Sequence, residues 1–320
     1  MSKSGEHQLA IPSGLANNWG QLAKILKEIA AGPGIAVAFS GGLDSRFLIH
    51  ACILLDLEVL ALHFTGQHIQ HSQTLHGLLW LEDRKIPCVT VRVDPLEIPE
   101  VQATDPERCY HCKFTAFQAL KSRAKQFSGF SLEAIGSPGS GDSESASLQL
   151  CDGTLFSDKT QYRPGQKATQ ELGVRSPLAE SGLTKSHVRE LAAALGMDAP
   201  DQPGQTCLLT RLDYGLPVDA ATLENLEEAE EAVVAVLSET NPGSRIPEFR
   251  VRLINRDGAA HPELHLCPPE NGTGTEAPFS PAVMDKLRAA LAAHGMPVVE
   301  IRVMQELSGF FDRKSNLRTV

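Results

Sequence analysis

A glycine-rich turn near the start of the chain combines the residue types that bind phosphate groups. It reads Ser40-Gly41-Gly42-Leu43-Asp44-Ser45. Two adjacent glycines let backbone amides approach an anion closely, and amides at the start of a helix point toward it. The hydroxyls of Ser40 and Ser45 add further donors. We therefore predict that this turn binds a polyphosphate.

Asp44 within the turn indicates a metal ion. A carboxylate beside a bound polyphosphate would repel it unless a divalent cation lay between them. We therefore expect Asp44 to hold Mg²⁺ and to be a catalytic residue. The turn has neither the Gly-x-x-x-x-Gly-Lys-Ser/Thr pattern of a Walker loop nor the Gly-x-Gly-x-x-Gly pattern of a dinucleotide loop, which excludes those two classes of nucleotide site.

Three of the seven cysteines form a second candidate centre. Cys109 and Cys112 make a C-x-x-C pair, which alone fits a zinc half-site, a redox pair or chance. Cys207 follows a segment rich in Pro and Gly and is the natural third member. Three thiolates with an open fourth position suit a 4Fe-4S cluster that binds an external sulfide. Of the other cysteines, we expect Cys52, Cys88 and Cys151 in the core. Cys267 has no assigned role.

Alternating strands and helices must position these residues. Strand patterns occupy residues 35–39, 59–64, 88–93 and 148–151, and helix patterns occupy residues 46–55, 73–85, 113–126 and 184–195. This alternation predicts an α/β fold with a doubly wound parallel sheet, and it places the glycine turn at the carboxyl end of the first strand.

The pattern changes near residue 217. A Glu-rich helix is predicted at residues 223–237 and strands at residues 249–254 and 298–304, so we expect domains at residues 1–217 and 218–320, the second a smaller α+β domain. We expect a surface loop at residues 137–145 and a polar linker at residues 271–278.

The composition limits the partners. The chain has 29 basic and 39 acidic residues and a formal net charge of −10, which argues against nucleic acid as the main partner. The first nine residues lack the apolar stretch of a signal peptide, and no segment is apolar enough to span a membrane. We therefore expect a cytoplasmic protein without a membrane partner.

Longer runs resemble a known enzyme family. The glycine turn is similar to the PP-loop of the ATP pyrophosphatase superfamily, whose domain is of the adenine nucleotide alpha hydrolase-like type. Further runs resemble the ATP-dependent sulfur transferases of the LarE type, which act in nickel-pincer cofactor biosynthesis. These runs are residues 105–113, 162–168, 171–180 and 207–215.

The resemblance implies a two-step reaction. Mg·ATP adenylates a carboxylate of a small pyridinium mononucleotide and releases pyrophosphate, and sulfur then replaces AMP. The glycine turn would hold the pyrophosphate, and His63 and Phe64 would lie near the adenosine. Members with the C-x-x-C pair carry a three-cysteine 4Fe-4S cluster that delivers hydrosulfide, whereas others sacrifice the sulfur of a single cysteine at the Cys207 position. Cys109 and Cys112 place this chain in the cluster group, with a sulfide donor as a partner.

The phosphate of such a substrate requires cationic residues. Arg250 and Arg252 share one face of a predicted strand and match a Val-Arg-Val-Arg segment of the family. Glu230 matches a family acidic residue near the same site, and Arg211 is a further candidate. A solvated strand edge is the alternative interpretation of the arginine pair. By the same resemblance, the C-terminal domain would bind substrate and support a homo-oligomer.

Departures from the family pattern leave the acceptor open. Residues 152–158 lack an Asn and an acidic residue of the family, and the segment before Cys207 lacks its Trp and Lys. Three other functions therefore stay in view. A tRNA-thiolating PP-loop enzyme is disfavoured by the acidic charge, and an amide-forming PP-loop synthetase has no need of three cysteines. A non-enzymatic carrier explains the turn or the cysteines but not both.

Overall fold

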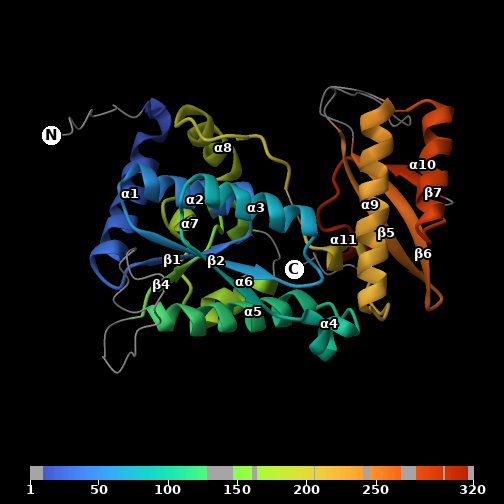
Figure 1. Cartoon of the computed structure of the whole chain (residues 1–320), viewed down its shortest axis with the longest axis horizontal. Helices are drawn as coiled ribbons and strands as arrows, with labels where there is room; N and C mark the ends of the chain where they lie inside the picture. Colours follow the sequence, from blue (N-terminus) through green and yellow to red (C-terminus); the bar gives the residue numbers. More distant parts are fainter. Residues whose placement is uncertain are drawn as a thin grey trace. The chain divides into compact units, whose positions relative to one another are not determined.

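The fold was derived from a computed structural model, which describes residues 10–127, 147–160, 164–204, 206–240, 246–267, 279–297 and 300–315 (Figure 1). The expected loop at residues 137–145 and the expected linker at residues 271–278 lie outside these ranges.

The chain forms two compact units. The N-terminal unit contains Met1–Thr65, His71–Val93 and Lys113–Gln205, and the C-terminal unit contains Gly66–Gln70, Asp94–Cys112 and Thr206–Val320. The sequence predicts a boundary near residue 217. The contacts instead separate the units between residues 205 and 206, and they assign two earlier segments to the C-terminal unit.

A four-stranded parallel sheet forms the centre of the N-terminal unit. Its order is β3-β2-β1-β4, and all three pairings are parallel. This confirms the predicted α/β fold with a doubly wound parallel sheet. Strands β2 and β4 lie on opposite sides of β1, so the order of the strands reverses at β1. Such a point of reversal, at the carboxyl ends of the strands, is where open parallel sheets bind ligands. The strands are β1 (Ile35–Phe39), β2 (Val59–Thr65), β3 (Cys88–Arg92) and β4 (Gln149–Cys151).

Helices cover both faces of this sheet. Ile35, Val37 and Phe39 pack with α1, α2 and α8, whereas the alternate residue Ala36 packs with Leu120 of α5 on the other face (Figure 1). Side chains that alternate between two apolar layers explain why β1 is apolar throughout. The helices are α1 (Ala16–Ala31), α2 (Leu43–Leu54), α3 (His71–Asp83), α5 (Arg108–Ala124), α6 (Pro164–Glu171), α7 (Pro177–Glu180) and α8 (Lys185–Ala194).

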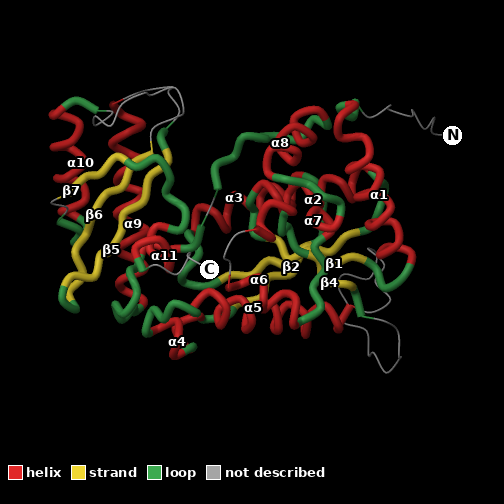
Figure 2. Tube along the Cα trace, turned by 180° about the vertical axis from the view of Figure 1, so that it is seen from behind, coloured by secondary structure: helices red, strands yellow, loops and turns green. Residues whose placement is uncertain are grey.

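The C-terminal unit has a smaller mixed sheet. Strands β5 and β6 pair antiparallel, and β6 and β7 pair parallel. Helix α9 packs against α10 and β5 (Figures 1 and 2). Strand β6 was not expected, because Pro262 and two histidines obscure its alternation. The elements are α4 (Pro99–Gln102), α9 (Ala220–Thr240), β5 (Glu248–Arg256), β6 (Ala259–Cys267), α10 (Pro281–Ala293), β7 (Glu300–Val303) and α11 (Phe310–Lys314).

Helix α5 begins earlier than the sequence pattern predicts. The expected start was residue 113, whereas the helix starts at Arg108. The Asp105 carboxylate accepts a hydrogen bond of 2.7 Å from the Glu107 amide, which supports the first turn in a way that apolar periodicity does not show. Cys109 and Cys112 therefore lie one helical turn apart on α5. Among the helices of the described ranges, none has the length and apolar character needed to cross a membrane.

Candidate active site

The glycine turn joins β1 directly to α2. Ser45 Oγ donates to the Gly42 carbonyl at 3.1 Å and lies 3.2 Å from Ser40 Oγ. Gly42 precedes α2 and gives the helix no side-chain cap. The first amides of a helix have no partner within the helix. The turn therefore presents two serine hydroxyls and the first amides of α2, and these groups can donate hydrogen bonds to an anion.

Close packing favours glycine in and beside the turn. Gly41 has φ of +74°, and a Cβ there would lie 3.3 Å from Gly77 Cα of α3. A Cβ on Gly153, which follows β4, would lie 3.0 Å from the Ser45 amide nitrogen. Gly77 and Gly153 were not expected as site residues. The available signal was Gly77 within a helical pattern, since such a glycine usually has a packing reason.

Asp44 is paired with a lysine that the sequence analysis missed. Lys185 Nζ donates to both Asp44 carboxylate oxygens, at 2.8 and 2.9 Å. Lys185 is the first residue of α8, and Thr184 caps this helix, because its side chain accepts a hydrogen bond from the His187 amide. The cap fixes where α8 starts and hence where Lys185 lies. A carboxylate and an ammonium thus meet beside the glycine turn, and both suit a Mg·polyphosphate.

The side chains of His63 and Phe64 in β2 point to opposite faces of the sheet. His63 is 1% exposed, its Nδ1 lies 2.8 Å from the Phe39 carbonyl oxygen, and its Nε2 has no hydrogen-bond partner in the described residues. Burial lowers the pKa of His63, so the ring is neutral at pH 7. Phe64 instead packs in the apolar layer on the other face. Their expected position near adenosine stays a prediction.

The three predicted cluster cysteines all lie in the C-terminal unit. Cys112 is buried, and Cys207 packs against the same apolar cluster. His68 contacts both segments, because its Nε2 lies 3.7 Å from Cys112 Sγ and its carbonyl accepts from the Leu208 amide at 2.8 Å. Within the described part of the chain, no group of three or more His, Cys, Asp or Glu side chains is arranged as a metal site. The thiol donors suit iron, but a formed cluster site is not observed.

The three cysteines that were expected in the core pack in or against it. Cys52 and Cys151 are fully buried, and Cys88 packs against the same apolar cluster. Burial raises the pKa of Cys52 to about 12 and that of Cys88 to about 11, so these thiols stay protonated and unreactive at neutral pH. Cys267 Sγ donates to the Gln305 carbonyl at 3.3 Å.

A buried ion pair holds the backbone next to Cys207. Arg211 and Glu230 are 2% and 4% exposed. The Arg211 Nε and Nη2 donate to the two Glu230 oxygens at 2.9 and 2.8 Å. Its Nη1 donates to the carbonyls of Thr206 at 3.1 Å and Cys207 at 3.3 Å. Glu230 also accepts from the Val251 amide at 3.1 Å. The pair therefore connects the Cys207 turn to α9 and β5.

Arg250 and Arg252 lie near this pair, and the charge of Arg211 acts on both of them. Burial, followed by the charge of Arg211, lowers the pKa of Arg250 to about 10. Burial, followed by Arg250 and Arg211, lowers the pKa of Arg252 to about 9. Arginine stays protonated at neutral pH, so both side chains are cations whose charge is disfavoured mainly by burial. We refer to Arg211, Glu230, Arg250 and Arg252 as the arginine cluster.

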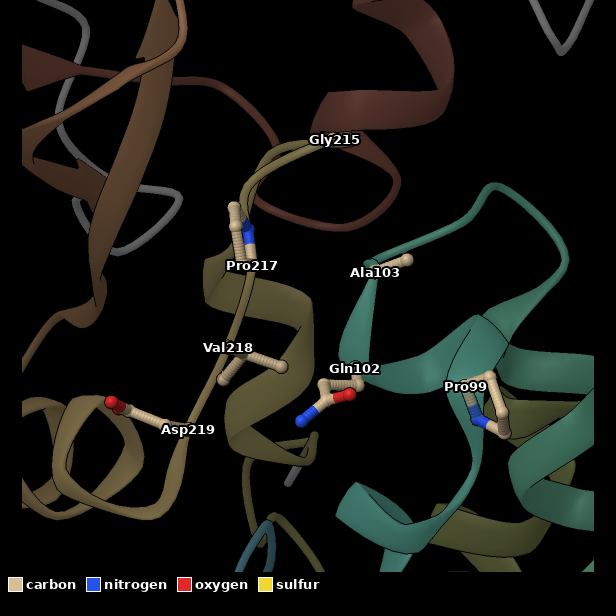
Figure 3. Close-up of a pocket in the computed structure, with 7 residues that line it drawn as sticks. All are labelled: Pro99, Gln102, Ala103, Gly215, Pro217, Val218 and Asp219. Carbon is tan, nitrogen blue, oxygen red and sulfur yellow. The ribbon is translucent and has the colours of Figure 1, made fainter.

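A pocket in the C-terminal unit is lined by other residues. It has a volume of about 470 Å³, and its lining contains none of the predicted site residues (Figure 3). Its carboxylate, Asp219, accepts from the Thr222 amide at 2.8 Å. The lining residues are Pro99, Gln102, Ala103, Gly215, Pro217, Val218 and Asp219.

A parallel α/β sheet whose central strand ends in a Ser-Gly-Gly-x-Asp-Ser turn before a helix defines a Rossmann-like fold of the PP-loop type. No family model matches the chain. The chain is 24% identical over 245 residues to pyridinium-3,5-bisthiocarboxylic acid mononucleotide synthase of Lactiplantibacillus plantarum. The aligned residues make up 75% of this chain and 78% of that protein.

Two further relatives match parts of the chain. An uncharacterized protein of Methanocaldococcus jannaschii is 27% identical over 212 residues, 66% of this chain and 73% of that protein. The tRNA(Ile)-lysidine synthase of Serratia proteamaculans is 30% identical over 86 residues, 27% of this chain and 20% of that protein. The two relatives that are named as synthases support an ATP-using PP-loop enzyme. The three-cysteine subgroup stays a prediction.

Proposed function

We propose that the chain is an ATP-dependent sulfur transferase that adenylates a carboxylate of a small pyridinium mononucleotide. The observation that carries this proposal is the glycine turn at the carboxyl end of β1, with Asp44 held by Lys185 at 2.8 Å. The name of the Lactiplantibacillus plantarum relative supports the substrate class and the transfer of sulfur.

In the first step, the turn would bind the β and γ phosphates of ATP. The amides at the start of α2 and the hydroxyls of Ser40 and Ser45 would donate to phosphate oxygens, and Lys185 would offset their charge. Asp44 would hold Mg²⁺, which when bound shields the negative phosphates from the carboxylate. A substrate carboxylate oxygen attacks the α phosphorus, the bond to the bridging oxygen breaks, and pyrophosphate leaves with the electron pair.

In the second step, a sulfur nucleophile attacks the acyl carbon of the adenylate. The carbon–oxygen bond to AMP breaks, AMP leaves with the electron pair, and a thiocarboxylate forms. Cys109, Cys112 and Cys207 would hold a 4Fe-4S cluster, which when bound offers an iron position for hydrosulfide. Arg211 would keep the Cys207 backbone in place through its contact of 3.3 Å.

The substrate phosphate would bind at the arginine cluster. Arg250 and Arg252 concentrate positive charge there, and burial strengthens their attraction for an anion. Arg211 and Glu230 are paired with each other, so we assign the contact with the substrate phosphate to Arg250 and Arg252.

The experiment for the first step is release of pyrophosphate from ATP in the presence of carboxylated pyridinium mononucleotides. Asp44→Asn is expected to lower the rate by at least about 100-fold while the thermal midpoint changes little. Asp56→Asn is the matched control, because Asp56 is exposed and should retain the wild-type rate. Equal rates in all three proteins would contradict the ATP site. Product formation only with tRNA, or only with ammonia, would favour one of the two alternative enzyme classes.

The cluster is tested by iron content after anaerobic reconstitution. The wild type is expected to bind iron and sulfide with visible absorbance typical of thiolate-bound clusters. Cys109→Ser should lose most of the iron, whereas Cys267→Ser should retain it. A wild type without iron would leave the adenylation proposal standing and remove the cluster from it.

A further inference from the structure

The Gln202 side chain connects the glycine turn to a buried arginine. Its Nε2 donates to the Gly41 carbonyl at 3.3 Å, and its Oε1 accepts from Arg46 Nη1 at 2.6 Å. Both contacts lie within the N-terminal unit. An amide carries a donor and an acceptor side by side, whereas a carboxylate only accepts and an ammonium only donates. Glutamine is therefore a residue type that can make both contacts.

Arg46 is itself fixed, so it gives Gln202 a rigid support. Arg46 is 5% exposed. Its Nη2 donates to the Asp198 carbonyl at 2.6 Å and lies 3.1 Å from the Asp198 carboxylate. Its guanidinium lies 5.2 Å from the ring centroid of Trp80, and Trp80 Nε1 donates to Asp198 at 2.9 Å. Because several contacts fix the Arg46 guanidinium, its bond to Gln202 Oε1 fixes the orientation of the Gln202 amide.

The contact with the Gly41 carbonyl determines which way the next amide points. In a trans peptide the carbonyl and the N–H point in opposite directions. The bond from Gln202 to the Gly41 carbonyl therefore sets the direction of the Gly42 N–H, which faces Ser40 Oγ at 3.4 Å. Glycines on both sides of a peptide allow it to rotate easily, and Gly41 already has φ of +74°.

We propose that Gln202 is a positioning residue that holds the Gly41–Gly42 peptide in the orientation that receives the phosphates of ATP. This rests on the proposed role of the glycine turn in binding ATP. Without Gln202, the peptide would sample both orientations, and the binding-competent fraction of the turn would fall. Reduced population of the competent state raises the apparent Kd in proportion.

The test is the Kd for Mg·ATP, together with KM and kcat for pyrophosphate release, in two Gln202 variants. Gln202→Glu keeps an acceptor for Arg46 but cannot donate to Gly41. Gln202→Met removes both contacts without adding charge. Both variants are expected to raise the Kd and the KM for ATP about tenfold with kcat within about twofold, which corresponds to ~1.4 kcal/mol, the upper range of one neutral hydrogen bond.

Arg84→Gln is the matched control. Arg84 binds the same Asp198 carboxylate, at 2.6 Å, but no described contact joins it to Gln202 or to the glycine turn. It should lower the thermal midpoint and leave the Kd for ATP unchanged. An unchanged Kd in Gln202→Met would overturn the proposal, and so would an equal increase in Arg84→Gln. A wild type that does not bind Mg·ATP would instead refute the proposed function, so the two failures are distinguishable.

Discussion

The glycine turn and the arginine cluster hold charge in different ways. In the turn, the Lys185 and Asp44 side chains are 35% and 27% exposed, and backbone amides supply the other donors. In the arginine cluster, Arg211 and Glu230 are 3% and 5% exposed at the side chain and make several hydrogen bonds. A partly exposed pair can exchange its partner for a ligand at little cost, whereas a buried pair cannot lose a member without leaving an unpaired charge.

The largest expected effect breaks the buried pair. Glu230→Gln should lower the free energy of unfolding by about 3–5 kcal/mol, because Arg211 keeps its charge and loses its counter-ion. Chemical denaturation with urea measures the change. Glu231→Gln, on the exposed face of α9, is the neighbouring control and should change stability by less than about 0.5 kcal/mol. Similar values for the two variants would show that the pair is not a structural element.

The second prediction concerns the partly exposed pair. Lys185→Met should raise the KM for ATP at least about tenfold, because one cation near the phosphates is lost. The same change should alter the free energy of unfolding by less than about 1 kcal/mol, as for other exposed pairs. Lys167→Met removes another helix lysine from a surface ion pair and should leave KM unchanged. A large loss of stability in Lys185→Met would abolish the contrast between the two regions.

The third prediction tests whether the arginine cluster favours an anion. Inorganic phosphate at millimolar concentration should stabilise the wild type by about 1 kcal/mol more than chloride at equal ionic strength, since a ligand that binds only the folded state stabilises it. Arg250→Gln should remove most of this difference. Arg256→Gln, at an exposed arginine of the same strand, should retain it. Stabilisation that is identical in all three proteins would show that the phosphate does not act at Arg250.

The smallest expected effect is a pH dependence in the N-terminal unit. Burial lowers the pKa of His63 below its usual 6.5. Between that lowered value and pH 6.5 the unfolded chain binds a proton that the folded chain does not, so stability falls as the pH decreases through this window. His63→Gln should make the profile of unfolding free energy against pH flatter between pH 7 and pH 5. The control is His261→Gln, at an exposed histidine, which should not flatten this profile.

The sequence predicts contiguous features well and scattered ones poorly. The strand at residues 35–39, the glycine turn and α2 lie in one run, so composition and periodicity identify them. Lys185 and Gln202 are distant from the turn in sequence, and their contacts depend on where α8 and the following segment pack. Strand β6 escaped detection because Pro262 occupies a position within it. The members of the arginine cluster are also scattered in the sequence. Their roles could therefore be proposed only from a family resemblance.

The start of α5 shows how a small difference in an element changes a site. A helix from residue 113 would leave Cys109 and Cys112 in a loop, where their side chains could diverge. A helix from Arg108 places them one turn apart, and the contact between His68 and Cys112 adds a constraint that spacing alone does not reveal. The Asp105 carboxylate accepts a hydrogen bond from the Glu107 amide just before this helix, and such a local contact depends on a single side chain rather than on periodicity.

The most direct test of the central claim is mass spectrometry of the products formed from ATP, isotope-labelled sulfide and a carboxylated pyridinium mononucleotide. We predict AMP and pyrophosphate in equal amounts, and a mononucleotide in which one oxygen of a carboxylate is replaced by labelled sulfur. Formation of ADP and inorganic phosphate, or a mononucleotide that acquires no labelled sulfur while AMP and pyrophosphate accumulate, would contradict the proposed sulfur transfer.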